Sequence, residues 1–274
     1  MPDRSAVCRH AWIPPGEKVV AELLCLVCHG IVQGERAGVA PEPVEAGGAD
    51  RCACAGELED PACRYAELAG LVHIALPSRP LTVVASVGTG ASSAGLIQPL
   101  RQHDPSARLV GVQPFGSVSF GSERFQDPEA IIAGIGSAIP FDNIRPDLYD
   151  QLHWLTFRYA MAGTIDLMRT HAVFAGLSTG AAFLVAAWEA QRHPEREHLV
   201  IGADTGHRYV DKVFARHEEA LAPAPLRPTE IGTLKDLAPP WSTMDWERRT
   251  YPDHARPSVP ASRPSPETCR APGS

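Results

Sequence analysis

Residues 56–220 alternate short apolar runs with segments in which apolar residues recur at helical spacing. Strand-like runs occupy residues 81–87, 108–112, 151–155, 172–175 and 198–203. Helical spacing occupies residues 61–76, 92–102, 159–170 and 179–191. Short apolar runs separated by helices are typical of a parallel sheet that is covered on both faces. We therefore expect a three-layer α/β/α domain with a mostly parallel sheet over residues 56–220.

The segments that flank this domain differ from it in composition. Residues 1–32 form a short Cys/His-rich segment, and residues 33–55 are rich in Gly, Ala, Pro and Glu, which is typical of a linker. Residues 221–274 contain 11 of the 26 prolines. We expect this tail to add no strand to the sheet and to be partly disordered, with Trp241 and Trp246 docking its first half on the domain.

Composition and charge narrow the class of function. The chain has 274 residues, of which 44% are hydrophobic and 21% charged, as in ordinary globular proteins. Its formal net charge of −7 argues against nucleic acid as a partner. No signal-peptide pattern is present, and the longest apolar stretch, residues 19–32, is interrupted by Glu22 and His29 and is too short to span a membrane. These features predict a cytoplasmic protein without a membrane partner.

Lysine is scarce in this chain, because Lys18, Lys212 and Lys235 are the only three. GC-rich codon usage explains such a bias toward arginine, and each lysine would then lie on solvated surface. Any mechanism that uses a lysine nucleophile nevertheless has only these three candidates.

The cysteines gather near the start of the chain. Six of the seven lie within the first 63 residues, and an odd number without a signal sequence argues against a disulfide framework. Cys8 and His10, followed by Cys25 and Cys28, have the residue types and paired spacing of a tetrahedral zinc site. In the alternative interpretation, Cys25 and Cys28 are buried apolar positions of a helix.

Three Gly-rich turns follow predicted strands, and ligands of parallel sheets bind beyond the carboxyl ends of the strands. The first turn, Gly88–Ser92, stands directly before a helix, where backbone N–H groups and the hydroxyls of Thr89 and Ser92 would favour an anion. It predicts a phosphate cradle, with a tight packing turn as the alternative. A dinucleotide-binding turn is disfavoured, because Ser93 replaces the third glycine and Gln113 stands where an acidic residue is expected.

The second turn, Gly176–Gly180, matches the nucleophile elbow of serine hydrolases, with Ser178 as the nucleophile. Asp204 and His207 follow in the right chain order, but they share one turn, whereas a triad takes these residues from separate loops. The alternative is that Ser178 places a hydroxyl against a ring nitrogen of a bound cofactor. The third turn, Asp204–Tyr209, is typical of a helix N-cap.

These turns, in this order, resemble the fold type II pyridoxal-phosphate (PLP) enzymes, especially the cysteine synthases and their 2,3-diaminopropionate synthase relatives. The matching segments read VASVGTGASSAGL, LVGVQPFGSVSFG, IAGIGSAIP, FAGLSTGAA and ADTGHRYVDKVF. Within them, Gly116-Ser117 and Phe120-Gly121 are similar to the diaminopropionate synthase branch. The resemblance covers residues 56–216, the large-domain portion only. It implies a PLP-dependent homo-oligomer that performs β-replacement on a small amino-acid substrate, namely serine, O-acetylserine or O-phosphoserine.

The resemblance also implies roles for individual residues. The cofactor phosphate would lie against Gly88, Thr89, Gly90, Ala91 and Ser92, although family members usually have glycine at the position of Ala91. Ser178 would contact the pyridine nitrogen, and Asp204 belongs to the same cofactor-binding set. The loop at the active-site mouth would consist of Gly134, Ile135 and Gly136.

One essential part of the family is not matched. Family members bind the cofactor aldehyde through a lysine near the N-terminus, followed by a small mobile domain with a Ser/Thr-Gly-Asn loop for the substrate carboxylate. Residues 1–55 are too few for that domain, and no lysine here has the family context, so the catalytic residues stay unassigned. The sequence leaves open a split enzyme whose protein partner supplies the lysine half, a non-catalytic binding or regulatory protein with a zinc knuckle, a degenerate gene product, and a serine hydrolase that uses Ser178.

Overall fold

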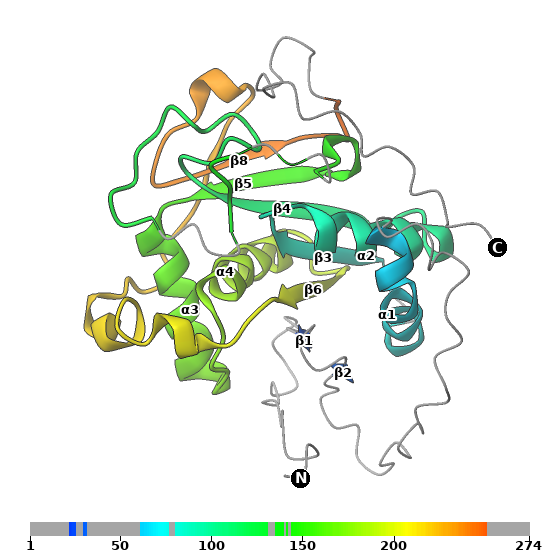
Figure 1. Cartoon of the computed structure of the whole chain (residues 1–274), viewed down its shortest axis with the longest axis horizontal. Helices are drawn as coiled ribbons and strands as arrows, with labels where there is room; N and C mark the ends of the chain where they lie inside the picture. Colours follow the sequence, from blue (N-terminus) through cyan, green and yellow to red (C-terminus); the bar gives the residue numbers. More distant parts are fainter. Residues whose placement is uncertain are drawn as a thin grey trace, which may run out of the picture.

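The computed structural model describes residues 22–25, 30–31, 61–76, 80–130, 135–139, 141 and 144–250, and for residues 22–25, 30–31, 61–64 and 67 it describes the backbone only. Within this part of the chain, eight strands form one sheet in the order β2-β1-β6-β3-β4-β5-β8-β7 (Figure 1). The strands are β1 (Glu22–Cys25), β2 (Gly30–Ile31), β3 (Leu81–Ser86), β4 (Arg108–Pro114), β5 (Gln151–Leu155), β6 (Glu197–Gly202), β7 (Thr229–Glu230) and β8 (Trp241–Asp245).

The middle of the sheet is parallel. Strand β3 pairs with β4 and β6, and β4 pairs with β5, all in parallel, while β8 runs antiparallel to β5. Every residue of β3 and of β5 is buried, which explains why their sequences are apolar runs rather than alternating patterns.

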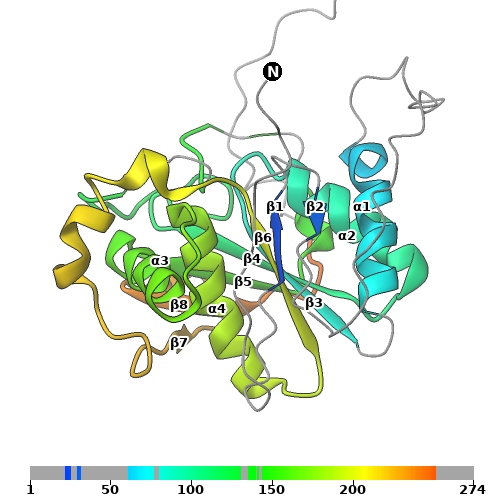
Figure 2. The same ribbon diagram turned by 90° about the horizontal axis from the view of Figure 1, so that it is seen from below.

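Helices cover both faces of the sheet (Figure 2). Helices α1 (Pro61–Ala75) and α2 (Ala91–His103) lie on one face, and α3 (Phe157–His171) and α4 (Leu177–Arg192) lie on the other. The side chains of Val83 and Ala85 pack into the core beneath α2, whereas Val84 packs into the core beneath α4. The structure therefore confirms the predicted three-layer α/β/α domain. Short 3-10 helices occupy η1 (Pro146–Leu148), η2 (Gly206–Tyr209), η3 (Phe214–Glu219) and η4 (Leu234–Asp236).

Close packing of α3 against α4 fixes the start of α4. A Cβ atom on Gly163 would lie 2.1 Å from the Gly180 carbonyl oxygen, and a Cβ atom on Gly180 would lie 2.0 Å from Thr164 Oγ1. Both glycines are therefore required for this crossing. Because Gly180 lies in the first turn of α4, the crossing also positions the residues that begin this helix.

The prediction that the Pro-rich tail adds no strand is wrong. Strand β8 pairs antiparallel with β5, and the side chain of Trp241 is only 1% exposed. The prolines of this segment flank strand β8 and do not interrupt it. Pro239 and Pro240 directly precede its first residue, Trp241. Composition averaged over the whole tail concealed a stretch that can pair. The predicted disorder of the last part falls on residues 251–274, which lie outside the described residues.

Two other expected elements differ from the structure. Residues 172–175 are not a strand, because Ala172 takes a left-handed conformation that ends α3, and only Ala175 forms an isolated bridge, with Thr205. The connection is therefore from helix to helix. Residues 22–25 form strand β1, so the alternative of an apolar helix through Cys25 is wrong. No helix in the described ranges is long and apolar enough to span a membrane.

Candidate functional site

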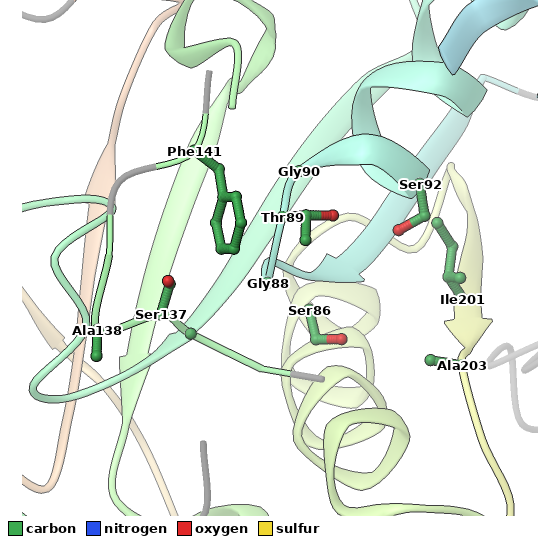
Figure 3. Close-up of a pocket in the computed structure, with 11 residues that line it drawn as sticks. Ser86, Gly88, Thr89, Gly90, Ser92, Ser137, Ala138, Phe141, Ile201 and Ala203 are labelled. Atoms are coloured by element: carbon green, nitrogen blue, oxygen red, sulfur yellow. The ribbon is translucent and has the colours of Figure 1, made fainter. Parts of the chain in front are cut away.

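A pocket of about 540 Å³ opens beyond the carboxyl ends of β3 and β6 (Figure 3). This is the edge at which parallel α/β sheets bind their ligands. Its lining comes from three segments: Ser86, Gly88, Thr89, Gly90 and Ser92 follow β3; Gly136, Ser137, Ala138 and Phe141 form the opposite wall; Ile201 and Ala203 come from the end of β6. We call these the turn wall, the loop wall and the β6 wall.

The turn wall ends in the N-terminus of α2. Gly90 precedes the helix with a φ of 81°, a left-handed conformation that glycine adopts without strain. The Ala91 N–H donates to Thr89 Oγ1 at 3.4 Å, and the Thr89 side chain is exposed. Ser93 is buried and turned away, since its hydroxyl donates to the Gly90 carbonyl at 3.1 Å. The wall therefore presents small residues, hydroxyls and the positive end of a helix dipole to the pocket.

The loop wall is held by hydrogen bonds that its backbone N–H groups donate. The Gly136 N–H donates to the Val87 carbonyl at 2.7 Å, and the Ser137 N–H donates to Ser117 Oγ at 3.1 Å. Gly136 has a φ of 75°, and a Cβ atom there would lie 2.3 Å from Pro114 Cγ, so only glycine fits. Of the three predicted mouth residues, Gly136 lines the pocket and Ile135 is buried in the core. Gly134 lies outside the described residues.

Ser178 and Asp204 lie together but do not line the pocket. Ser178 is the second residue of α4 and is fully buried, and its hydroxyl donates to Asp204 Oδ1 at 3.5 Å. The Tyr209 hydroxyl donates to the other carboxylate oxygen at 3.2 Å, and the Gly176 N–H donates to the Asp204 carbonyl at 2.9 Å. Burial raises the pKa of Asp204, and this effect outweighs the two side-chain hydrogen bonds. Neighbouring Ala203 does line the pocket.

The geometry does not form a hydrolase triad. His207 is exposed, its Nδ1 lies 2.9 Å from Thr205 Oγ1, and its ring packs on Phe174 with centroids 5.0 Å apart. The hydroxyl of Ser178 is bonded to a carboxylate rather than to an imidazole. A nucleophile elbow also follows a strand directly, whereas the element before Gly176 is helix α3.

Two of the three lysines lie in the described part of the chain, and both are exposed. Lys212 lies in a turn between η2 and η3, and Lys235 lies in η4. Neither lines the pocket. Lys18 lies outside the described residues.

Most of the predicted zinc ligands lie outside the part of the chain that the structure describes. Cys8, His10 and Cys28 lie outside the described residues, and only the backbone of Cys25 is described, in β1. Among the described ranges, no group of three or more His, Cys, Asp or Glu side chains is placed to hold a metal ion. The zinc site stays a prediction.

Sequence reasoning missed several residues of the pocket. These are Ser86, Ser137, Ala138, Phe141, Ile201 and Ala203. Ser137 and Ala138 directly follow Gly134, Ile135 and Gly136 in the sequence, so extending that motif by two residues would have included them. Ile201 and Ala203 face the turn wall only because β6 pairs with β3, a neighbour relation that local sequence does not carry.

Comparison with known proteins agrees with this geometry. Residues 63–203, just over half of the chain, match the family model described as pyridoxal-phosphate dependent enzyme. A cysteine synthase from Helicobacter pylori is 34% identical over 158 residues, which cover 56% of this chain and 50% of the relative. An N-(2-amino-2-carboxyethyl)-L-glutamate synthase from Cupriavidus metallidurans is 35% identical over 152 residues, 53% of this chain and 42% of the relative.

A solved structure gives the same result. The O-acetylserine dependent cystathionine β-synthase from Helicobacter pylori is 32% identical, with a TM-score of 0.50 over 56% of this chain and 49% of that chain. This chain thus spans about half the length of the relatives it matches. The family match includes the turn wall, the loop wall and the β6 wall. The chain therefore belongs to the family of pyridoxal-phosphate dependent enzymes, with a cysteine-synthase-like fold type II domain.

Proposed function

We propose that this chain forms the cofactor-binding part of a cysteine-synthase-like β-replacement enzyme of amino-acid metabolism. The observation that carries the proposal is the pocket, in which the Gly88–Ser92 turn and the Gly136 loop face each other at the carboxyl edge of the sheet. Serine, O-acetylserine and O-phosphoserine are the proposed substrates. O-Acetylserine is tested first, because the Helicobacter pylori enzyme whose structure is solved is named an O-acetylserine dependent cystathionine β-synthase.

The residues present fit the phosphate end of PLP. The turn wall offers the hydroxyls of Thr89 and Ser92 and the N-terminus of α2, which together suit a phosphate without a cationic side chain. The pocket volume of about 540 Å³ lies within the range of small-molecule sites. When bound, PLP supplies an electron-withdrawing ring that stabilises negative charge on the substrate's α-carbon.

Ser178 and Asp204 are proposed to serve the ring end of the cofactor. Ser178 would turn its hydroxyl from Asp204 toward the pyridine nitrogen, while Tyr209 continues to donate to the Asp204 carboxylate. A neutral serine at the nitrogen leaves the ring a weaker electron sink than a carboxylate would, which suits β-replacement. A side chain at position 176 would displace the Asp204 carboxylate, because a Cβ atom there would lie 1.9 Å from Asp204 Oδ1.

The residues described here do not fit the aldehyde end of PLP. Both described lysines are exposed and outside the pocket lining. We propose that a protein partner supplies the lysine and the carboxylate-binding loop. The alternative is a non-catalytic binding or regulatory protein that keeps the pocket, with zinc held by Cys8, His10, Cys25 and Cys28.

The first experiment is a PLP titration followed by borohydride trapping and peptide mapping. We expect saturable binding without a covalent adduct, weakened about a hundredfold or more in a Thr89→Val/Ser92→Ala variant, since two hydrogen bonds to an anion are lost. Ser106→Ala is the matched control, because Ser106 is exposed and its hydroxyl donates to Asp104 instead. Absence of saturable binding would contradict the cofactor proposal, and an adduct on Lys18, Lys212 or Lys235 would contradict the need for a partner.

Further measurements separate the alternatives. Turnover of O-acetylserine that begins only on addition of a second polypeptide supports the split enzyme, and PLP binding without turnover in any combination supports the regulatory protein. Zinc in the purified full chain, with loss of stability on chelation, supports the zinc knuckle. Labelling of Ser178 by a fluorophosphonate would support the hydrolase. Light scattering tests the proposed homo-oligomer.

A further inference from the structure

Gln113 shares a hydrogen-bond acceptor with the loop wall of the pocket. It lies near the end of β4 and is fully buried. Its Nε2 donates to the Val87 carbonyl at 3.1 Å, and the Gly136 N–H donates to the same oxygen at 2.7 Å. The carbonyl group of Val87, which lies between Ser86 and Gly88 of the turn wall, therefore accepts from a β4 side chain and from the glycine of the loop wall.

The other end of the same amide is unpaired. Gln113 Oε1 is buried and has no hydrogen-bond partner within the described ranges. Gln151 offers a comparison, since its Nε2 donates to Thr243 Oγ1 at 3.1 Å and its Oε1 accepts from Arg108 at 3.2 Å. A buried acceptor without a partner costs free energy, and methionine would fill similar space without that cost. Structural hydrogen bonds thus account for both ends of the Gln151 amide, but for only one end of the Gln113 amide.

We infer that Gln113 is a positioning residue, which sets the geometry of both pocket walls through the Val87 carbonyl. The C=O of Val87 and the N–H of Gly88 belong to one planar trans peptide and point in opposite directions. Holding the oxygen therefore fixes the direction of the Gly88 N–H, the first backbone donor of the turn wall. The same oxygen accepts from the Gly136 N–H, so the position of this one oxygen affects both walls. The consequence for PLP affinity rests on the proposed function.

The test compares Gln113→Met with Gln151→Met as the matched control. Hydrogen exchange in the protein without added PLP is the first measurement, because it needs no ligand. We expect Gln113→Met to speed exchange in residues 87–92 and 135–139, and Gln151→Met to leave both segments unchanged. We also expect Gln113→Met to weaken PLP binding about fivefold to tenfold, the range for the loss of one hydrogen bond.

The outcomes separate this inference from the proposed function. If the unaltered chain does not bind PLP, the proposed function fails, while the exchange data still test Gln113. Unchanged exchange in both segments of Gln113→Met would overturn the inference.

Gln113→Glu adds a measurement in which pH switches the donor to the Val87 carbonyl on and off. A protonated carboxyl donates to the Val87 carbonyl as the amide does, whereas a carboxylate cannot. Burial raises the pKa of such a carboxyl, so the donor persists at mildly acidic pH. We expect the PLP affinity of Gln113→Glu to equal that of the unaltered chain at mildly acidic pH and to fall below it as the pH rises. A ratio of the two affinities that does not change with pH would overturn the inference.

Discussion

The pocket and the contact between β5 and β8 are built in opposite ways. In the pocket, mostly small residues form the walls, and hydrogen bonds of the backbone, such as that from Gly136 to Val87, hold them. Between β5 and β8, polar side chains fill the interior. His153, Glu189, Trp241 and Thr243, which we call the buried polar cluster, have exposures between 0% and 3%.

The buried polar cluster is held by its own side chains. Trp241 Nε1 donates to His153 Nδ1 at 3.0 Å, and Thr243 Oγ1 lies 3.1 Å from His153 Nε2. Glu189 Oε1 lies 3.4 Å from the same nitrogen. These contacts join β8 to β5 and to α4. The pocket is an open volume, whereas the side chains of the cluster are buried in the core. We therefore expect mutations in the pocket to change mainly ligand affinity, and mutations in the cluster to change mainly the free energy of unfolding.

Trp241→Ala should have the largest effect on stability. The side chain is 1% exposed, and its removal also takes away the donor to His153 Nδ1. We expect a loss of about 3–5 kcal/mol in the free energy of unfolding, measured by urea denaturation. PLP affinity of the folded fraction should stay unchanged. Trp241→Phe, which keeps most of the volume, should cost less, and a fall in PLP affinity in either variant would show that the two regions are coupled.

Acid should destabilise the fold through His198, a buried residue of β6. Burial lowers the pKa of this histidine to about 4, outweighing the attraction of the Glu189 carboxylate. Because the folded pKa lies below the ordinary value of 6.5, its contribution is complete above pH 6.5 and is lost as the pH falls toward 4. We expect a loss of about 2 kcal/mol between roughly pH 7 and pH 5.

The burial of His153 acts in the same direction, since it also lowers that pKa. His198→Leu isolates the contribution of His198, because this variant should show a flatter dependence of stability on pH than the unaltered chain. Urea denaturation at a series of pH values measures both proteins. Equal pH dependence in the two would contradict the assignment to His198.

The sequence predicts the pocket better than it predicts the cluster. Apolar runs located β3, β4, β5 and β6, and the glycines located the Gly88–Ser92 turn, because these signals are local. The cluster depends on β8 pairing with β5 across a long separation, and the proline content of residues 221–274 hid that strand. The unpaired oxygen of Gln113 is equally invisible in sequence, since it depends on what packs around the side chain.

Gly90→Ala tests whether the turn wall needs its left-handed residue. With a φ of 81°, alanine would cost about 1–2 kcal/mol or shift the turn. We expect PLP affinity to fall by more than the stability change explains, measured by titration beside thermal unfolding. Gly70→Ala is the matched control, because Gly70 lies in α1 with open space around its Cβ direction. That control should gain about 0.5–1 kcal/mol and keep its PLP affinity.

Ser117→Ala should have the smallest effect on stability and a local effect on the loop wall. Ser117 is fully buried, and its hydroxyl accepts from the Ser137 N–H at 3.1 Å and donates to Ser119 Oγ at 3.3 Å. We expect a loss of about 1 kcal/mol, with faster hydrogen exchange confined to residues 135–139. Ser119→Ala is the control, since it keeps the bond to Ser137. Faster exchange in β5 or β8 would contradict the separation of the two regions, because the hydrogen bonds of Ser117 reach the loop wall and none reaches the buried polar cluster.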